Sequence, residues 1–378
     1  MNSIYGEDLE TFRDTVRSFF ERELAPRLPY FEEHGLDRAF WHAAGRAGLL
    51  GSQVPEVHGG ADAGPLAAMI ISEELGHSTA AGATGSSLNA DVLTSMLVEN
   101  GSAEQHRRWF PGILTGDITQ ALAVTEPQAG SDVSLLRTSA LRDGDDYVVN
   151  GSKCFITNGA KADLIYTVVR VMPGAGARSL TVLAIDANTP GITRRRTRTS
   201  AFKACDTGEI FFDDVRVPAG DRIGPEGGAL AIFRSIMSMD RLQLSARSLA
   251  AAETAFELTL THCRDRRLFG QRLIDLQNTQ FVLASVETEL KVGRAFLDSL
   301  IVRARDDKLS ADEGAMAKIW LPEMEARVMD ACIQLWGGSG MMEEMPIARL
   351  HAASRVQRIY AGATELMKAQ IARRYLEE

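Results

Sequence analysis

Hydrophobic residues in the first 119 positions recur at the spacing of amphipathic helices. The first apolar face is formed by Leu9, Phe12, Val16 and Phe19. Pro26 is expected to end this segment, because proline disrupts the interior of a helix. Similar segments, separated by glycines, follow at residues 37–47, 65–75 and 90–99. The pattern predicts an N-terminal α-helical domain over residues 1–119.

From residue 120 onward, short runs of β-branched and aromatic residues replace the helical spacing. They are bounded by Gly, Asn, Asp and Pro and lie at residues 147–150, 152–157, 164–170, 180–185 and 209–217. Such runs are typical of strands, so we expect a middle antiparallel β domain over residues 120–225. Residues 173–176 are expected to form a hairpin loop. They are not a dinucleotide fingerprint, because no third glycine and no helix follow them.

The last third of the chain again has helical character. Residues 229–269 contain neither Gly nor Pro, and a helix of that length needs partners on several sides. Three further helices are expected, with breaks near Gly293, near Gly314 or Pro322, and at residues 337–346. We therefore predict a C-terminal four-helix-bundle domain over residues 226–378.

Composition narrows the functional classes. The hydrophobic share of 45% and charged share of 24% are ordinary for a globular protein, and a net charge of −9 argues against a broad nucleic-acid surface. The four cysteines form no C-x-x-C pair and the seven histidines are dispersed, so no metal site is expected. Residues 1–20 lack the apolar region of a signal peptide, and no apolar run reaches membrane-spanning length. A cytoplasmic protein is expected.

Two neighbouring motifs carry the strongest chemical signal. Residues 123–132 read A-V-T-E-P-Q-A-G-S-D, and residues 151–159 read G-S-K-C-F-I-T-N-G. Hydroxyls and open backbone N–H groups gather in the first loop, and anionic or carbonyl-rich cofactors favour such places. An ordinary β-hairpin is the alternative for one motif alone. At this spacing the pair resembles the flavin-binding face of the acyl-CoA dehydrogenase family, and the resemblance extends over nearly the whole chain.

The resemblance implies an α+β fold with three parts: an N-terminal helical domain, a middle antiparallel β domain and a C-terminal four-helix bundle. It also implies FAD as cofactor. Its flavin ring would lie against Leu122, Val124, Thr125, Ser131, Phe155, Ile156 and Thr157. Phe155 stands where many members have Trp, and Thr157 would hydrogen-bond at the reactive edge of the ring.

Two further segments resemble the part of the family that reaches the FAD of a neighbouring subunit. The first, residues 266–277, reads R-R-L-F-G-Q-R-L-I-D-L-Q, and the second, residues 334–340, reads Q-L-W-G-G-S-G. The implied contacts come from Arg266, Phe269, Gln277, Gln334, Gly337 and Gly338. Ordinary helix ends are the alternative for each segment. Sharing of FAD between subunits implies a homo-oligomer, commonly a tetramer in this family.

One departure from the family decides the chemistry. Many members remove the substrate Cα proton with a Glu in an I-Y-E-G-T motif, but here the segment reads I-Y-A-G-A-T-E and places Ala361 there. Members such as isovaleryl-CoA dehydrogenase carry a Glu before an Arg on the long helix instead, and Asp240 precedes Arg241 in the matching stretch. Asp240 is therefore the expected base. A solvated helical Asp240–Arg241 pair is the alternative.

The shorter side chain of Asp240 matters. It reaches less far than Glu by one methylene, roughly 1.5 Å, and a misplacement of about 1 Å can cost about 100-fold in rate. The backbone or the substrate must shift to compensate, or the enzyme does not depend on fast deprotonation.

Other site residues follow from the same resemblance. The backbone N–H of Ala361, with a flavin ribityl hydroxyl, would hold the thioester carbonyl, and the alanine methyl leaves room for a branched or bulky acyl group. Ser131, Ser238, Arg241 and Gly362 would contact substrate, and Ala363, Thr364 and Glu365 would lie at the cofactor. Three departures stand out: Ala363 replaces a Thr that meets the pyrophosphate, Ala352–Ala353 replaces an Arg-Asp pair, and Ser238 replaces an Asp that contacts pantetheine.

These features predict an FAD-dependent acyl-thioester dehydrogenase that forms an α,β-double bond in an acyl-CoA or acyl-carrier-protein substrate. An electron-transfer flavoprotein would accept the electrons by family analogy. The basic cluster at residues 194–198 is expected to be a solvated face, with docking of an acidic carrier as the alternative. A flavin-dependent oxidase or monooxygenase on the same fold remains an alternative enzyme. A flavin-bearing binding protein is the non-enzyme alternative.

Overall fold

The N-terminal part of the chain is helical, as predicted. The computed structural model describes residues 4–85, 88, 90–172 and 176–376. Its first helices are α1 (Glu7–Phe19), α2 (Leu28–His34), α3 (Arg38–Arg46), α4 (Pro65–His77), α5 (Ala81–Thr84), α6 (Ala90–Asn100) and α7 (Ala103–Thr115). Two of them begin at side-chain caps: Asp37 accepts the N–H of Phe40 at 2.9 Å, and Ser102 forms a capping box with Gln105.

The middle of the chain forms one eight-stranded sheet. Its strands are β1 (Gln120–Ala123), β2 (Ser139–Asp143), β3 (Asp146–Ile156), β4 (Leu164–Arg170), β5 (Leu180–Asp186), β6 (Ile192–Arg196), β7 (Gly208–Pro218) and β8 (Arg222–Ile223). They run in the order β6-β7-β3-β2-β4-β5-β8, and β1 pairs with β4. The β4 and β5 strands pair antiparallel across the predicted hairpin loop, of which residues 173–175 lie outside the described part.

Two details of the sheet differ from the prediction. It is mixed, because β1 runs parallel to β4 and Ser139 of β2 pairs parallel with Arg170 of β4. The runs at 147–150 and 152–157 are one strand, β3, and not two. The register of β3 against β7 shifts at Gly151, where φ is 146° and an added Cβ would lie 2.6 Å from Thr138 Oγ1. A glycine can take this place in a strand because it has no side chain.

Long helices dominate the C-terminal part. They are α8 (Ala229–Asp265), α9 (Gln277–Arg305), α10 (Ala311–Trp336), α11 (Pro346–Gln357) and α12 (Thr364–Ala372), and the hairpin of β9 (Arg267–Leu268) and β10 (Gln271–Arg272) joins α8 to α9. The break expected near Gly293 was wrong, because α9 runs through it, and so was the alternative at Pro322, which lies inside α10. The break expected near Gly314 lies just before it, at residues 306–310, and Gly314 itself belongs to the first turn of α10. The two glycines face neighbouring helices instead: an added Cβ would lie 3.2 Å from Leu249 at Gly293 and 3.0 Å from the Ser238 carbonyl at Gly314.

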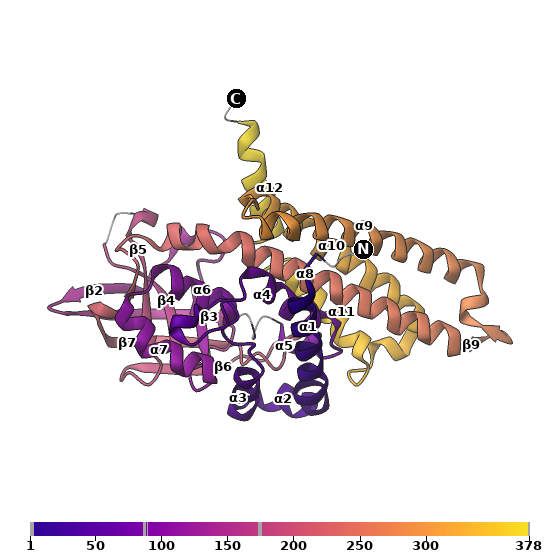
Figure 1. Cartoon of the computed structure of the whole chain (residues 1–378), viewed down its shortest axis with the longest axis horizontal. Helices are drawn as coiled ribbons and strands as arrows, with labels where there is room; N and C mark the ends of the chain where they lie inside the picture. The colour runs from indigo at the N-terminus through magenta and orange to yellow at the C-terminus, as the bar shows by residue number, and fades with distance from the viewer. Residues whose placement is uncertain (1–3, 86–87, 89, 173–175, 377–378) are drawn as a thin grey trace.

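The hydrophobic cores join the three parts of the chain. One buried cluster contains Phe19 and Ile70 from the N-terminal helices together with Leu249 and Leu321 from the bundle. Figure 1 shows the sheet at one end of the long axis and the β9 hairpin at the other, with the helix labelled α4 alongside α8. A Cβ at Gly76 of α4 would lie 2.6 Å from the Ala250 Cβ, so these two helices cross closely.

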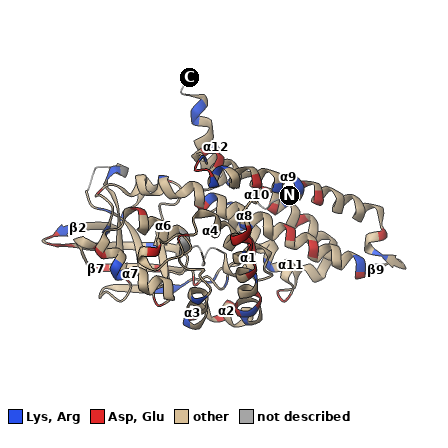
Figure 2. Ribbon diagram, viewed as in Figure 1, with Lys and Arg blue, Asp and Glu red and all other residues tan. Residues whose placement is uncertain are grey.

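Buried ion pairs fasten the N-terminal helices to the bundle. Glu73 of α4 accepts Arg13 of α1 at 2.9 Å and Arg294 of α9 at 2.7 Å. Elsewhere acidic and basic residues are intermingled along the elements, as Figure 2 shows. Among the described residues, no helix is both long and apolar enough to cross a membrane.

Candidate functional site

The two predicted flavin motifs lie side by side. The first follows β1, in which Ala121 and Ala123 are buried while Leu122 and, just beyond, Val124 are half-buried on the other face. The second is the end of β3. A hydrogen bond of 2.9 Å from the N–H of Cys154 to the carbonyl of Thr125 joins them, so Thr125 lies next to residues 155–157.

A buried ion pair between Lys153 and Glu126 holds the two motifs together. Lys153 Nζ lies 2.9 Å from Glu126 Oε1 and 2.9 Å from the Val124 carbonyl, and both side chains are almost fully buried. Glu126 also accepts the N–H groups of Arg137 and Thr138 at 2.7 and 2.9 Å. Although burial opposes the charged form, Lys153 and these donors lower the pKa of Glu126 to about 2. The pair fixes the loop after β1 to β3.

The surface above the junction fits a flat, polar-edged ring. Phe155 is 69% exposed and has a left-handed φ of 58°, which is unusual for an aromatic residue. The next residue, Ile156, is buried, and Thr125 and Thr157 near it are half-buried. Gly130 and Ser131 are exposed, and a Cβ at Gly130 would meet nothing within 4 Å. An exposed aromatic face beside hydroxyls and open backbone suits the isoalloxazine ring expected from the sequence.

Asp240 lies on α8, just after the part of this helix that packs against the sheet. Ile232 and Ile236 pack in the cluster that holds Tyr166 of β4, and Asp240 follows one turn later. Ser238 is half-buried, and its carbonyl lies close to Gly314 of α10. Asp240 and Arg241 are both buried, which does not agree with a solvated helical pair. Charges near Asp240 come from Arg241 and from Lys318 of α10.

The segment that carries Ala361 forms a tight turn against this part of α8. Ala361 and Gly362 both have positive φ, 54° and 96°. Lys318 Nζ donates to the Gly362 carbonyl at 2.5 Å, and Arg241 Nε makes a long contact of 3.5 Å with the Ala361 carbonyl. Among the described residues, no acceptor is recorded for the Ala361 N–H. Arg241 therefore lies against the turn of Ala361 and Gly362, and its neighbour Asp240 interacts electrostatically with Tyr360, the residue that precedes this turn.

The start of α12 follows directly from this turn. Ala363 is its N-cap, Thr364 is its first residue and the exposed Glu365 is its second. The Thr364 hydroxyl is buried and has no hydrogen-bond partner among the described groups. Because helix N-termini favour anions, this orphaned hydroxyl fits the expected contact with a phosphate-bearing cofactor.

Tyr360 anchors the turn from the other side. Its hydroxyl accepts from Arg247 Nη2 and donates to Gln357 Oε1 at 2.6 Å. Its ring meets Phe202 edge-on at a centroid distance of 6.3 Å. Phe202 belongs to a small apolar cluster with Ala353, with Ala352 packed against it. The Ala352–Ala353 departure therefore has a packing role here.

The remaining predicted cofactor residues form a separate group at the far end of the bundle. Arg266, Phe269, Gln277, Gln334, Gly337 and Gly338 are all exposed, and Phe269 is 88% exposed at the tip of the β9–β10 hairpin. His262 stacks on Trp336 at 4.2 Å, which joins the end of α8 near Arg266 to the turn that starts at Gly337. Figure 1 places this hairpin opposite the sheet that holds β3. The two groups of predicted cofactor residues therefore lie on opposite ends of the chain.

The basic cluster after β5 is mostly engaged within the chain. Arg194 donates to the Ala162 carbonyl at 2.6 Å, Arg195 pairs with Glu209 at 2.6 Å, and Arg196 donates to the Lys203 carbonyl at 2.7 Å. A fully solvated face was therefore wrong for Arg194 and Arg196. Their guanidinium groups hold the edge strand β6 against neighbouring segments.

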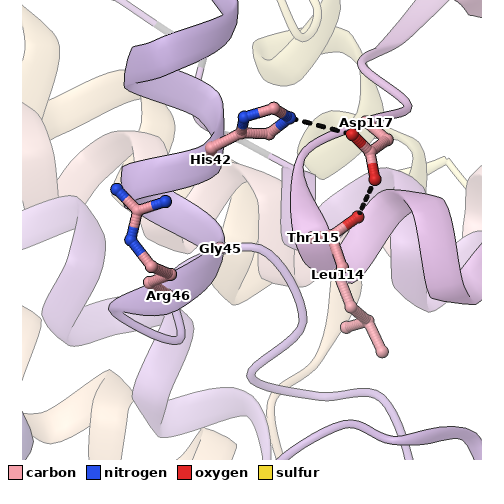
Figure 3. A pocket seen from close by; sticks show the side chains of 6 residues that line it. All are labelled: His42, Gly45, Arg46, Leu114, Thr115 and Asp117. Carbon is pink, nitrogen blue, oxygen red and sulfur yellow. Dashed lines mark hydrogen bonds and ion pairs between the residues drawn. The ribbon is translucent and has the colours of Figure 1, made fainter.

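Another surface hollow, between α3 and α7, contains none of the predicted residues. Figure 3 shows Asp117 between His42 Nε2 at 2.8 Å and Thr115 Oγ1 at 2.6 Å. The hydroxyl donates to the carboxylate and not to the imidazole, so the group lacks the nucleophile–base hydrogen bond of a hydrolytic site. We assign it a structural role.

Sequence reasoning missed Lys318, Tyr360 and the Glu126–Lys153 pair. A signal existed for Lys318. Lys318 and Glu325 share one stripe of α10 with Ala315, Leu321 and Val328, so charged residues occur at helical spacing on an apolar face. Burial raises the pKa of Glu325 to about 8. The partners of these side chains lie on distant segments, and the sequence pattern does not give them.

Comparison with known proteins covers almost the entire chain. Three domain families match: the acyl-CoA dehydrogenase N-terminal domain at residues 6–117, its middle domain at 121–215 and its C-terminal domain at 227–376. The mitochondrial long-chain specific acyl-CoA dehydrogenase of Sus scrofa is 36% identical over 379 residues, which cover 99% of this chain and 88% of that protein.

Solved structures agree with these matches. An acyl-CoA dehydrogenase from Geobacillus kaustophilus superimposes with a TM-score of 0.93 at 38% identity, over 98% of both chains. A prolyl acyl carrier protein oxidase superimposes with a TM-score of 0.89 at 25% identity, over 98% of this chain and 99% of that one. The predicted three-part fold is thereby confirmed.

Proposed function

Because the chain belongs to the acyl-CoA dehydrogenase family and is a flavin oxidoreductase acting on CH–CH donors, we propose that it forms an α,β-double bond in an acyl thioester with Asp240 as the base. The observation that carries the proposal is the meeting of the buried Asp240 with the turn of Ala361, whose N–H has no recorded acceptor among the described residues. Membership in this family of oxidoreductases sets aside the non-enzyme alternative.

Each residue of this proposed site has a role in the reaction. The Ala361 N–H donates to the thioester carbonyl and stabilises the negative charge that develops there. The Asp240 carboxylate accepts the Cα proton. When bound, FAD supplies the acceptor for the hydride that leaves Cβ, so the substrate loses one proton and one hydride. Residues 122–131 and 155–157 would hold the ring, and Thr364 would meet the phosphates.

The side chain at position 361 points to the class of acyl group. Alanine occupies less space than the glutamate of many relatives, so the region beside Cα and Cβ accepts a branched or bulky chain. One solved structure that shares the fold is named a prolyl acyl carrier protein oxidase, and a prolyl group is cyclic. Both coenzyme A and carrier-protein thioesters therefore belong in the first experiment.

That experiment is an anaerobic titration of the FAD-loaded protein with acyl-CoA and acyl-carrier-protein thioesters, with straight, branched and cyclic chains. We expect one class to bleach the visible flavin band. Failure of every thioester would overturn the proposed dehydrogenation. Rapid reoxidation by air with formation of peroxide or hydroxylated product would instead favour the oxidase or monooxygenase. Reoxidation by an electron-transfer flavoprotein would support that protein as partner.

The separation of the two cofactor groups supports a shared flavin between two copies of the chain. Arg266 of one copy would pair with the FAD pyrophosphate held mainly by the other, through charge-assisted hydrogen bonds. A homo-oligomer, with a tetramer as the family precedent, is part of the proposal.

Substitution Arg266→Ala is expected to weaken FAD binding by about 10-fold, since a hydrogen bond to a charged group contributes about 1.5 kcal/mol. The dissociation constant of FAD for the apoprotein, measured by flavin fluorescence, checks this value. The neighbouring exposed Arg264→Ala is the matched control and should bind FAD like the wild type. Equal affinity of the Arg266→Ala variant and the wild type would remove this residue from the cofactor site.

A further inference from the structure

Two cations from different helices meet the turn that follows Tyr360. Lys318 of α10 is completely buried, and its Nζ donates to the Gly362 carbonyl at 2.5 Å. Arg241 of α8 approaches the preceding carbonyl, that of Ala361, at 3.5 Å and donates from Nη1 to Gln370 Oε1 of α12 at 3.1 Å. A buried ammonium needs hydrogen-bond partners, and here its recorded partner is a backbone carbonyl of the proposed site.

The turn itself needs support. Ala361 and Gly362 both occupy the left-handed region, with φ of 54° and 96°. A non-glycine residue is unfavourable there and persists only where its surroundings hold it. A Cβ at Gly362 would lie 2.6 Å from Met367 Cε, so α12 closes the turn on its other side. The donor from Lys318 fixes the peptide that directly follows the Ala361–Gly362 link.

The charge of Lys318 also faces the proposed base. Among the described residues, the charged groups that act most strongly on Lys318 are Arg241 and Asp240 from α8, Glu365 from α12 and Glu323 from its own helix. Of these carboxylates only Asp240 is buried, while Glu365 is exposed and Glu323 half-buried. Burial and the charge of Arg241 lower the pKa of Lys318 to about 8, so it is still charged at neutral pH. Arg241, Lys318 and Tyr360 are among the described groups that lie close enough to Asp240 to interact with it electrostatically.

We infer that Lys318 is a positioning residue of the reaction. Its ammonium fixes the Ala361–Gly362 turn so that the Ala361 N–H is presented to the substrate carbonyl, and its charge favours the carboxylate form of Asp240 that accepts the Cα proton. The inference rests on the proposed function, because it assigns Lys318 to the same site. It adds a residue that does not touch the reacting atoms.

The test compares Lys318→Met, which removes both donor and charge, with Lys318→Arg, which keeps the charge. Lys368→Met, an exposed lysine on α12, is the matched control. The visible flavin spectrum verifies that each variant folds and retains FAD. The rate of anaerobic flavin reduction is measured across pH with a thioester that bleaches the wild type, and the affinity for the product enoyl thioester is measured separately.

For Lys318→Met we expect reduction to slow by about 10-fold, since the turn loses its support, with little change in enoyl-thioester affinity. The acidic limb of the rate profile should move to higher pH by about one pH unit, because loss of a nearby cation disfavours the carboxylate. In Lys318→Arg, which keeps the positive charge, the acidic limb should lie close to its wild-type pH. An unchanged rate and limb in Lys318→Met, or equal loss of FAD from both variants, would leave Lys318 a structural residue and overturn the inference.

A second readout does not need turnover. The carboxyl titration of Asp240, followed by ¹³C NMR of aspartate-labelled protein and assigned with Asp240→Asn, should shift to higher pH in Lys318→Met. If no thioester reduces the wild type, the proposed function fails while this titration still decides the electrostatic role of Lys318. An Asp240 titration that is the same in wild type and Lys318→Met would refute that role.

Discussion

Asp240→Asn is expected to slow anaerobic flavin reduction by a thioester about 10²- to 10⁴-fold while FAD stays bound, which is the range for loss of a general base. Asparagine has nearly the same shape as aspartate and cannot accept the proton. The site should otherwise persist, because the carbonyl contacts at Ala361 and Gly362 come from Arg241 and Lys318. Rapid mixing with the visible flavin band as signal measures the effect.

Two matched variants make this result interpretable. Asp330→Asn, an exposed carboxylate on α10, should reduce like the wild type. Asp240→Glu keeps a carboxylate and reaches further by one methylene, so it should remain far faster than the Asn variant. If Asp240→Asn reduces its flavin at the wild-type rate, Asp240 is not the base, and oxygen chemistry becomes the leading function.

Lys153→Met is expected to lower the free energy of unfolding by about 3–5 kcal/mol, because it leaves the buried Glu126 carboxylate without its counter-charge. The loop after β1 should loosen, and FAD affinity should fall with it. Urea denaturation of the apoprotein measures the stability. The double variant Glu126→Gln, Lys153→Met should lose less free energy of unfolding than Lys153→Met alone, because it has no unpaired buried charge.

An exposed pair in the same sheet provides the control. Arg195→Met, which removes the partner of Glu209 on β7, should cost less than about 1 kcal/mol. If Lys153→Met and Arg195→Met lower the free energy of unfolding by the same amount, the buried pair stabilises the protein no more than the surface pair does.

The pH dependence of stability has a definite sign for Glu126. Its folded pKa, about 2, lies below the unfolded value of roughly 4.3, so its contribution is fully present above the unfolded value. That contribution is lost as pH falls from there toward about 2. In Glu126→Gln this part of the acid sensitivity should disappear, and denaturation midpoints between these pH values measure it.

Short-range patterns predicted most elements of the fold. Apolar spacing gave the helices that begin at Glu7 and Pro65, and β-branched runs gave β4, β5 and β7. Glycines were harder to interpret, because the same residue ends a helix or allows two helices to meet. Gly314 does the latter with Ser238, and only the packing of α10 on α8 distinguishes the two roles.

The candidate site was predicted in its parts, and its assembly was not. Motif resemblance proposed the loop of residues 122–131, residues 155–157, Asp240 and Ala361 as parts of the site. Lys318 lies 43 residues before Ala361 in sequence, and its bond to Gly362 depends on how α10 and the turn pack. The same holds for the Glu126–Lys153 pair, which exists because β3 lies beside the loop after β1.

The sequence by itself determined the order of helical and β segments, the family resemblance and the absence of a carboxylate at position 361, because each depends on residue type and on spacing along the chain. Only the tertiary structure decided that Asp240 is buried near the Ala361 turn, that two cations from separate helices contact that turn, and that the β9–β10 hairpin lies at the opposite end of the chain from the sheet. The physical reason is that burial and charge pairing depend on contacts between distant segments, which arise when helices and sheet pack together.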